Sequence, residues 1–273
     1  MSLRESLKTV QVTDGTIAVL DAGEGSPVVL LHGGALDHRM WQPQIDVLRS
    51  THRVVAIDAR GHGASSSPTT PFRHARDVAA VLEQLDIASA TLVGLSMGAS
   101  TALDTALAYP ALVEAMVISG AGASSPEFVD PWVLDIFMTW HEAQQQGDAQ
   151  KWLESFLLFV SGPHRELAQV DNAIVDHVRD LAEHTMRTHV PSGMPILPEW
   201  VPGAAQRLGE IDVPVLGIAG GIDADDHVRM TTEAAAAVPH GRMVIIDGTA
   251  HYPNLEQPAQ FNELLRDFLT QVV

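Results

Sequence analysis

The feature that most restricts how this chain can fold is a series of short apolar runs, rich in β-branched residues, that alternate with helical segments. Runs of this length and composition are typical of strands that are buried on both faces of a sheet. Strands that alternate with helices pair in parallel, and the helices cover both faces. The sequence therefore predicts an α/β fold with a mostly parallel, doubly wound sheet. The predicted strands are residues 27–32, 53–58, 90–95, 115–120, 213–220 and 242–247.

The N-terminal segment departs from this alternation. Residues 8–12 and 16–23 both have strand composition, and only Thr13-Asp14-Gly15 separates them. A short turn that contains Asp-Gly joins antiparallel strands. We therefore expect a hairpin at one edge of the sheet.

The strand pattern stops between residues 122 and 207, where only helical stretches are evident. This interval holds four of the five tryptophans and four of the seven phenylalanines. An aromatic-rich helical insertion between core strands is typical of a lid over a pocket, although a larger helical layer would show the same composition. We expect a core domain of residues 1–121 and 208–273 and a lid at 122–207. The candidate substrate-binding residues of the lid are Trp132, Phe137, Trp140 and Phe159.

Charge and cysteine content exclude several classes of function. Sixteen basic and 34 acidic residues give a net charge of −18, which repels nucleic acids and anionic membranes, so we expect neither as a partner. The absence of cysteine excludes disulfides, thiolate metal sites and a cysteine nucleophile, and is compatible with a reducing cytoplasm. No signal-peptide core or membrane span is evident. We therefore expect a soluble, cytoplasmic protein; the sequence does not indicate its oligomeric state.

A serine lies between two glycines where a predicted strand meets a predicted helix, in Gly94-Leu95-Ser96-Met97-Gly98. The glycines lack a Cβ atom where chain segments crowd, so a tight strand-to-helix turn becomes possible. This turn would expose the hydroxyl of Ser96 above the sheet, next to the unpaired N–H groups of the following helix. The pattern predicts that Ser96 is a nucleophile.

A nucleophilic serine needs a general base, and the base needs a carboxylate that orients it. His251 follows the predicted strand 242–247, immediately before the last helix, and Asp223 follows the strand 213–220. Both positions are at the carboxyl ends of strands, as Ser96 is. We therefore expect Ser96, Asp223 and His251 to form a catalytic triad, with nearby Asp225 as a less favoured alternative for the acid.

An oxyanion hole requires two N–H donors beside the nucleophile. The strand 27–32 ends in His32-Gly33-Gly34, whose small residues let a backbone N–H approach a ligand closely. We assign the two donors to the N–H groups of Gly34 and Met97, although the glycine pair is also compatible with a plain tight turn. We expect His32 to have a structural role in this loop.

Several of these segments resemble the α/β-hydrolases, and the resemblance covers nearly the whole chain. "MWQPQIDVL", "DARGHGAS", "GLSMG" and "NLEQPAQFN" are especially similar to 3-oxoadipate enol-lactonases and related small esterases. The resemblance implies the α/β-hydrolase fold with a helical lid, and it places nucleophile, acid and base at Ser96, Asp223 and His251. The chain departs from the family at Ala224, where proline is common after the acid, and at Gly34-Ala35, where bulkier residues are frequent.

Two further groups of polar residues permit other interpretations. Asp58, Arg60 and His62 in "DARGHGAS" could form a second site, but the glycine spacing and the resemblance favour a structural turn. The segment "DADDHVR" could hold a metal ion with His227, but residues this close in sequence usually form a solvated loop, and no second ligand group is apparent. We expect no metal site.

The expected function is hydrolysis of a small carboxylic ester or lactone through an acyl-enzyme, which water resolves without a cofactor. Three alternatives stay open at this point. The same triad could cleave a carbon–carbon bond in a β-diketone-like substrate, or form peracids as a cofactor-free haloperoxidase does. A non-catalytic ligand receptor would keep the pocket but lack turnover.

Overall fold

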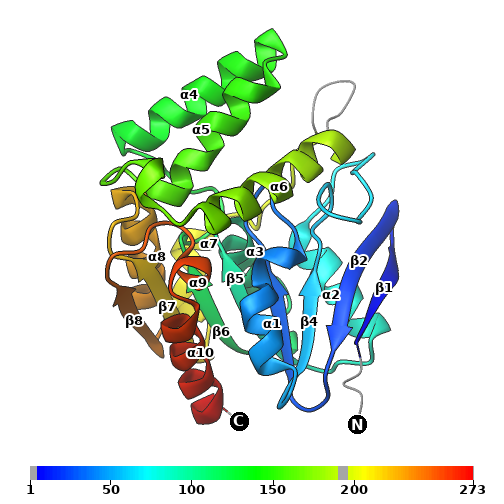
Figure 1. Cartoon of the computed structure of the whole chain (residues 1–273). Coiled ribbons are helices and arrows are strands. Elements are labelled where there is room, and N and C mark those ends of the chain that lie inside the picture. Colours follow the sequence, from blue (N-terminus) through cyan, green and yellow to red (C-terminus); the bar gives the residue numbers. More distant parts are fainter. Residues whose placement is uncertain (1–4, 190–195, 273) are drawn as a thin grey trace.

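The computed structural model describes residues 5–189 and 196–272, and these form one eight-stranded sheet with helices on both faces (Figure 1). The strand order across the sheet is β1-β2-β4-β3-β5-β6-β7-β8. The strands are β1 (Glu5–Val12), β2 (Gly15–Ala22), β3 (Pro27–Leu31), β4 (Arg53–Ile57), β5 (Ala90–Leu95), β6 (Val113–Ser119), β7 (Val215–Gly220) and β8 (Gly241–Ile246). The helices are α1 (Gln42–Leu48), α2 (His74–Gln84), α3 (Met97–Ala108), α4 (Pro131–Gln146), α5 (Ala149–Ser161), α6 (Asn172–His189), α7 (Ala204–Arg207), α8 (Asp225–Ala237), α9 (Pro253–Glu256) and α10 (Pro258–Val272).

The pairing of the strands confirms the predicted sheet. From β4 through β3 to β8 all neighbours are parallel, whereas β1 and β2 form an antiparallel hairpin and β2 is antiparallel to β4. Parallel strands bring their carboxyl ends to one edge of the sheet, and loops at that edge form the sites of open α/β folds. The predicted edge hairpin is confirmed, since β1 is the outermost strand.

The alternation of side chains along β3 shows why the sheet needs helices on both faces. Val28 and Leu30 belong to the apolar cluster that includes residues of α1 and α10, whereas Val29 and Leu31 belong to the cluster that includes residues of α2 and α3. All four side chains are buried. A strand with apolar residues on both faces is stable only when a helical layer covers each of them.

The expectation that all six predicted strands are buried on both faces is wrong for β8. This strand is at the edge of the sheet, and the side chain of Ile245 is 40% exposed. Arg242 of the same strand is also exposed. Because β8 pairs with only one neighbouring strand, its side chains are less completely buried than those of a central strand. The apolar composition of residues 242–247 therefore does not lead to complete burial.

The segment between β6 and β7 contains the helices α4, α5 and α6, which lie beyond the carboxyl ends of the strands (Figure 1). Helix α5 packs against both α4 and α6. Buried residues of all three helices, such as Ile136, Phe156 and Val178, belong to the same apolar cluster as Ile45 of α1. The lid boundaries at 122 and 207 stay a prediction, and residues 190–195 within them lie outside the described residues.

Three buried amide side chains connect α1 to the C-terminal helices. One belongs to the segment "MWQPQ" and two belong to "NLEQPAQFN", so these bonds give the polar residues of both segments a structural role. The Gln44 side chain donates to Oδ1 of Asn262 (2.9 Å) and to the carbonyl of Asn254 (3.2 Å). The Asn254 amide donates to the carbonyl of Met40, and the Asn262 amide donates to that of Pro43 (3.1 Å each). Buried amides without partners are costly, so these bonds fix the position of α9, which begins two residues after His251.

Within the described ranges 5–189 and 196–272, no helix combines the length and the apolar character that a membrane span requires.

Candidate active site

Ser96 lies at a sharp turn between β5 and α3, as predicted. Its backbone has φ 54° and ψ −116°, a conformation that residues other than glycine rarely adopt. A Cβ atom at Gly94 would overlap the carbonyl oxygen of Gly98, and one at Gly98 would overlap that of Leu31. Both glycines are therefore needed for α3 to begin this close to β3 and β5.

Two contacts hold Ser96 at the centre of the carboxyl edge. Its N–H donates to the carbonyl of Ser119 at the end of β6 (2.7 Å). The next residue, Gly120, has φ +67°, and a Cβ there would lie 2.7 Å from Cε1 of His251. Ser96 and the His251 ring thus contact the same dipeptide. The hydrogen bonds of the described residues do not include one between Ser96 and His251; this contact is often long without substrate.

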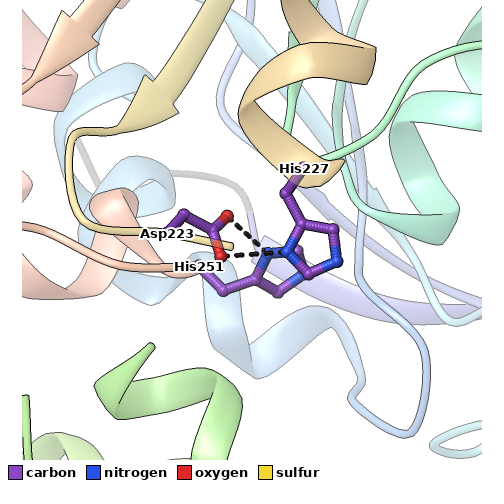
Figure 2. Close-up of side chains that lie close together, drawn as sticks. All are labelled: Asp223, His227 and His251. Carbon is purple, nitrogen blue, oxygen red and sulfur yellow. Dashed lines mark hydrogen bonds and ion pairs between the residues drawn. The ribbon is translucent and has the colours of Figure 1, made fainter. Parts of the chain in front are cut away.

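Asp223 and His251 are brought together from the loops that follow β7 and β8 (Figure 2). The Nδ1 atom of His251 lies 2.9 Å from Oδ2 of Asp223, and both side chains are buried. Since a carboxylate accepts only, Nδ1 carries the proton, and Nε2 of His251 is left as the basic nitrogen. Asp225, the less favoured candidate for the acid, is exposed, and its backbone N–H donates to the carboxylate of Asp130 (3.1 Å).

A second histidine, which the sequence analysis did not assign to this site, binds the same carboxylate. Nδ1 of His227, in the first turn of α8, lies 2.9 Å from Oδ1 of Asp223 (Figure 2). The two imidazole rings are in contact, with centroids 4.1 Å apart and planes tilted by 35°. Asp223 lies two residues before α8, so a spacing of four residues brings its carboxylate against the first turn of that helix, where His227 lies. This spacing from Asp223 is the signal that could have identified His227.

Burial and charge act in opposite directions on this cluster. Burial alone would raise the pKa of Asp223, but the charges of His227 and His251 and the bonds they donate hold it below its usual value. The pKa of His251 is lowered, first by burial and then by the charge of His227, although Asp223 opposes this. The carboxylate is therefore ionised and the imidazole neutral near pH 7, as a general base must be.

The loop after β3 contains the first of the two predicted oxyanion donors, the N–H of Gly34. A Cβ at Gly34 would meet no atom within 4 Å, so its backbone borders open space. The described residues provide no acceptor for the N–H of Gly34. Met97 is the first residue of α3, and an N–H there has no acceptor within its own helix. Among the described residues, neither predicted donor N–H therefore has an acceptor of its own.

The histidines of two predicted structural segments brace this loop. Nδ1 of His32 donates to the carbonyl of Gly33 (2.7 Å), and Nε2 accepts from the N–H of Ala59 (2.9 Å). Nε2 of His62 accepts from the N–H of Ala35 (3.1 Å), which has φ 61°. The segment "DARGHGAS" thus supports the conformation of the loop that contains Gly34.

The other polar residues of that segment have structural partners. Asp58 accepts hydrogen bonds from the backbone N–H groups of His38 and Ala64. Arg60 forms a buried ion pair with Asp77 (2.7 Å). Each of these bonds holds backbone or neighbouring side chains in place, as the structural interpretation of the turn expects.

Four aromatic residues of the predicted lid are connected to His251 by a series of ring contacts. The ring of Phe159 is 5.4 Å from that of His251 and 5.5 Å from that of His227. Trp132 and Trp140 each contact Phe159 at 5.7 Å, and Phe137 contacts Trp140 at 5.1 Å. Of these four residues, Phe159 is the one that touches the Asp223–His251 pair.

Two groups of acidic and histidine side chains in the described parts of the chain are close enough to share a cation: Asp223 with His227 and His251, and Asp37 with His38 and Asp58. Asp223 already accepts from both of its histidines, and Asp58 from His38 (2.7 Å). These bonds account for the short distances, and we assign neither group as a metal centre.

The chain is similar to proteins of a known family. Residues 28–264 match the model of the family described as "Alpha/beta hydrolase family". A 2-hydroxy-6-oxononadienedioate/2-hydroxy-6-oxononatrienedioate hydrolase of Paraburkholderia phymatum is 29% identical over 92% of this chain and 90% of its own. The 3-oxoadipate enol-lactonase 1 of Acinetobacter baylyi is 26% identical over 93% of this chain and 92% of its own. The structure of the esterase RhEst1 from Rhodococcus covers 100% of both chains with a TM-score of 0.80 and 25% identity.

The buried histidines predict that stability falls as the pH decreases below about 6.5. Burial lowers the pKa of His32, His62 and His251 and, with the charges of His32 and Arg60, lowers that of His74 to about 3. The unfolded chain then binds more protons than the folded one, so the free energy of unfolding decreases with decreasing pH. His38 opposes this trend, because its bond to Asp58 raises its pKa although burial would lower it.

His74→Phe should reduce this dependence by about 1 kcal/mol between pH 6.5 and 5.5, since it removes one group that must stay neutral. Urea unfolding of the wild type and the variant at pH 7.5, 6.5 and 5.5 measures the difference. His240→Gln, at an exposed position, is the control and should leave the slope unchanged. Parallel curves for wild type and His74→Phe would contradict the prediction.

Proposed function

Because this chain belongs to the α/β hydrolase family, we propose that it is a serine hydrolase that cleaves a small carboxylic ester or lactone. The observation that carries the proposal is the Asp223–His251 pair beside the strained backbone of Ser96. The similarity to an enol-lactonase and to an esterase structure supports the choice of substrate class. The similarity to the dienedioate hydrolase favours carbon–carbon bond cleavage as the second candidate.

In the proposed reaction, Oγ of Ser96 attacks the acyl carbonyl while Nε2 of His251 takes its proton. Asp223 holds the imidazole in the tautomer with the proton on Nδ1 and stabilises the imidazolium that forms. The N–H groups of Gly34 and Met97 donate to the oxyanion. His251 then protonates the leaving alkoxide, and a water molecule that His251 deprotonates hydrolyses the acyl-enzyme. Ser96 regains its proton in the last step.

We further propose that α4, α5 and α6 act as a lid whose aromatic side chains shape the substrate pocket. The contact between Phe159 and His251 supports this role, because a substrate acyl group at Ser96 must lie close to both rings. The chemistry would then reside at the carboxyl edge of the sheet, and the preference for substrates in the insertion.

The nucleophile is tested by labelling with a fluorophosphonate probe and mapping of the adduct by mass spectrometry. We expect the label on Ser96, and Ser96→Ala should abolish it and lower kcat on the order of 10⁴-fold or more while the fold stays intact. Ser100→Ala, one turn further along α3, is the control and should keep both labelling and activity. A label on another residue would overturn the proposal. A panel of p-nitrophenyl esters, lactones and β-diketones identifies the bond that is cleaved.

The identity of the acid is tested by comparing two neighbouring aspartates. Asp223→Asn should lower kcat on the order of 10⁴-fold, because an amide favours the wrong tautomer of His251. Asp225→Asn changes an exposed residue, whereas the bond to His251 comes from Asp223, so its kcat should stay near that of the wild type. The opposite pattern in steady-state kinetics would assign the acid to Asp225.

The lid is tested with two phenylalanines of α5 that match in burial, Phe159 (5% exposed) and Phe156 (4% exposed). Replacement of either by leucine should reduce the free energy of unfolding by about 1 kcal/mol. Only Phe159→Leu should change the ratio of kcat/KM between short-chain and long-chain esters, by about tenfold. Urea melts and an ester series measure both quantities. An unchanged ratio in Phe159→Leu would show that the helices form a structural layer.

A further inference from the structure

The carboxylate of Asp223 is held from two sides, and only one side serves the proposed general base. His251 binds Oδ2 (2.9 Å), whereas Oδ1 accepts from Nδ1 of His227 (2.9 Å) and from the N–H of Ala224 (2.8 Å). The Asp223 side chain is 1% exposed, and each imidazole is 5% exposed. Figure 2 shows the two rings next to one another, with His227 reaching down from α8.

The surroundings of His227 leave it one polar partner. Within the described residues, its side chain forms no hydrogen bond other than that to Asp223. The rings of Phe128 (6.3 Å) and Phe159 (5.5 Å) contact it from the insertion. An imidazole buried among aromatic rings is costly unless its N–H is bonded. The bond to Asp223 is therefore the polar interaction that stabilises His227 at this buried position.

The other ionisable groups around this cluster are bound to different partners. Asp226, beside His227 on α8, pairs with Arg229 (2.7 Å). Glu256 of α9 pairs with Arg165 and accepts from the N–H of Ala250. The ring of Tyr252 packs edge-on against His251, and burial together with the charge of Asp223 keeps its hydroxyl protonated by raising its pKa. His227 and His251 are thus the side chains that donate hydrogen bonds to Asp223.

We propose that His227 is a positioning residue that holds Oδ1 of Asp223, so that Oδ2 stays directed at Nδ1 of His251 and the buried carboxylate stays ionised. The inference rests on the proposed function, since it gives His251 the role of base. A carboxylate rotates readily about its last torsion. With one oxygen fixed by His227 and Ala224, that rotation is blocked and the imidazole keeps its orientation toward Ser96.

The proposal is tested by two substitutions and a control on the same helix. His227→Leu removes the donor at similar volume, whereas His227→Asn keeps an N–H close to the place of Nδ1. Thr231→Val alters a buried residue one turn further along α8 that bonds the carbonyl of His227. This control variant tests whether any disturbance of α8 changes activity as His227→Leu does. The measurements are kcat, KM and the pH profile of kcat/KM, together with one-dimensional proton NMR of the imidazole N–H region.

His227→Leu should lower kcat about ten- to a hundredfold with little change in KM, the effect of losing one hydrogen bond to a charged group. Its loss also removes the electrostatic effect by which His227 lowers the pKa of His251, so the acid limb of the pH profile should move upward. His227→Asn should recover most of kcat, and Thr231→Val should resemble the wild type. The wild type should show two strongly deshielded N–H signals, and His227→Leu one.

Wild-type kcat and an unmoved acid limb in folded His227→Leu would overturn the proposal. An asparagine variant no better than the leucine variant, or an equal loss in Thr231→Val, would overturn it as well. Failure of the proposed function looks different, because the wild type itself then lacks turnover and labelling at Ser96. In that case the proton spectrum decides: a single deshielded signal in the wild type refutes the two-sided hold on Asp223.

Discussion

The close approach of α3 to the ends of β3 and β5 is the constraint on which the rest of the site depends. It is possible only because Gly94 and Gly98 have no side chains where the carbonyl oxygens of Gly98 and Leu31 lie. The approach forces Ser96 into its strained backbone conformation and turns the first N–H groups of α3 toward the carboxyl edge. Strain of this kind persists when surrounding structure determines it, here the bond from Ser96 to Ser119 at the end of the neighbouring strand.

Much of this arrangement was predictable from the sequence, because it follows from local rules. The alternation of apolar runs with helices determines the parallel sheet, and parallel strands place their carboxyl ends together. Ser96, Asp223 and His251 each follow a strand, so their gathering at one edge follows from topology alone. The exposure of Ile245 was not predictable in the same way, since the apolar composition of β8 does not reveal that it is the edge strand.

The parts of the site that sequence reasoning missed depend on contacts between distant segments. His62 binds the backbone of Ala35, 27 positions earlier, and nothing in "DARGHGAS" indicates that partner. His227 was considered only as a metal ligand, and no second ligand group was apparent from the sequence. The second group, His251, is 24 positions away and meets it at Asp223. A helical spacing predicts which side chains share a face, but not which charge that face meets.

The site thus divides into a part fixed by the sheet and a part supplied by the insertion. The position of His251 is fixed by the helix that follows it, α9. The amides of Gln44, Asn254 and Asn262 bond the C-terminal helices to α1. None of these bonds involves α4, α5 or α6. The insertion contacts the two histidines through the aromatic ring of Phe159, and its Arg165 also pairs with Glu256 of α9. Polar bonds of defined geometry therefore position the reacting groups, while apolar contacts, which tolerate changes of shape more readily, border the space for substrate. Relatives of one fold can then keep the reacting groups and differ in what they bind.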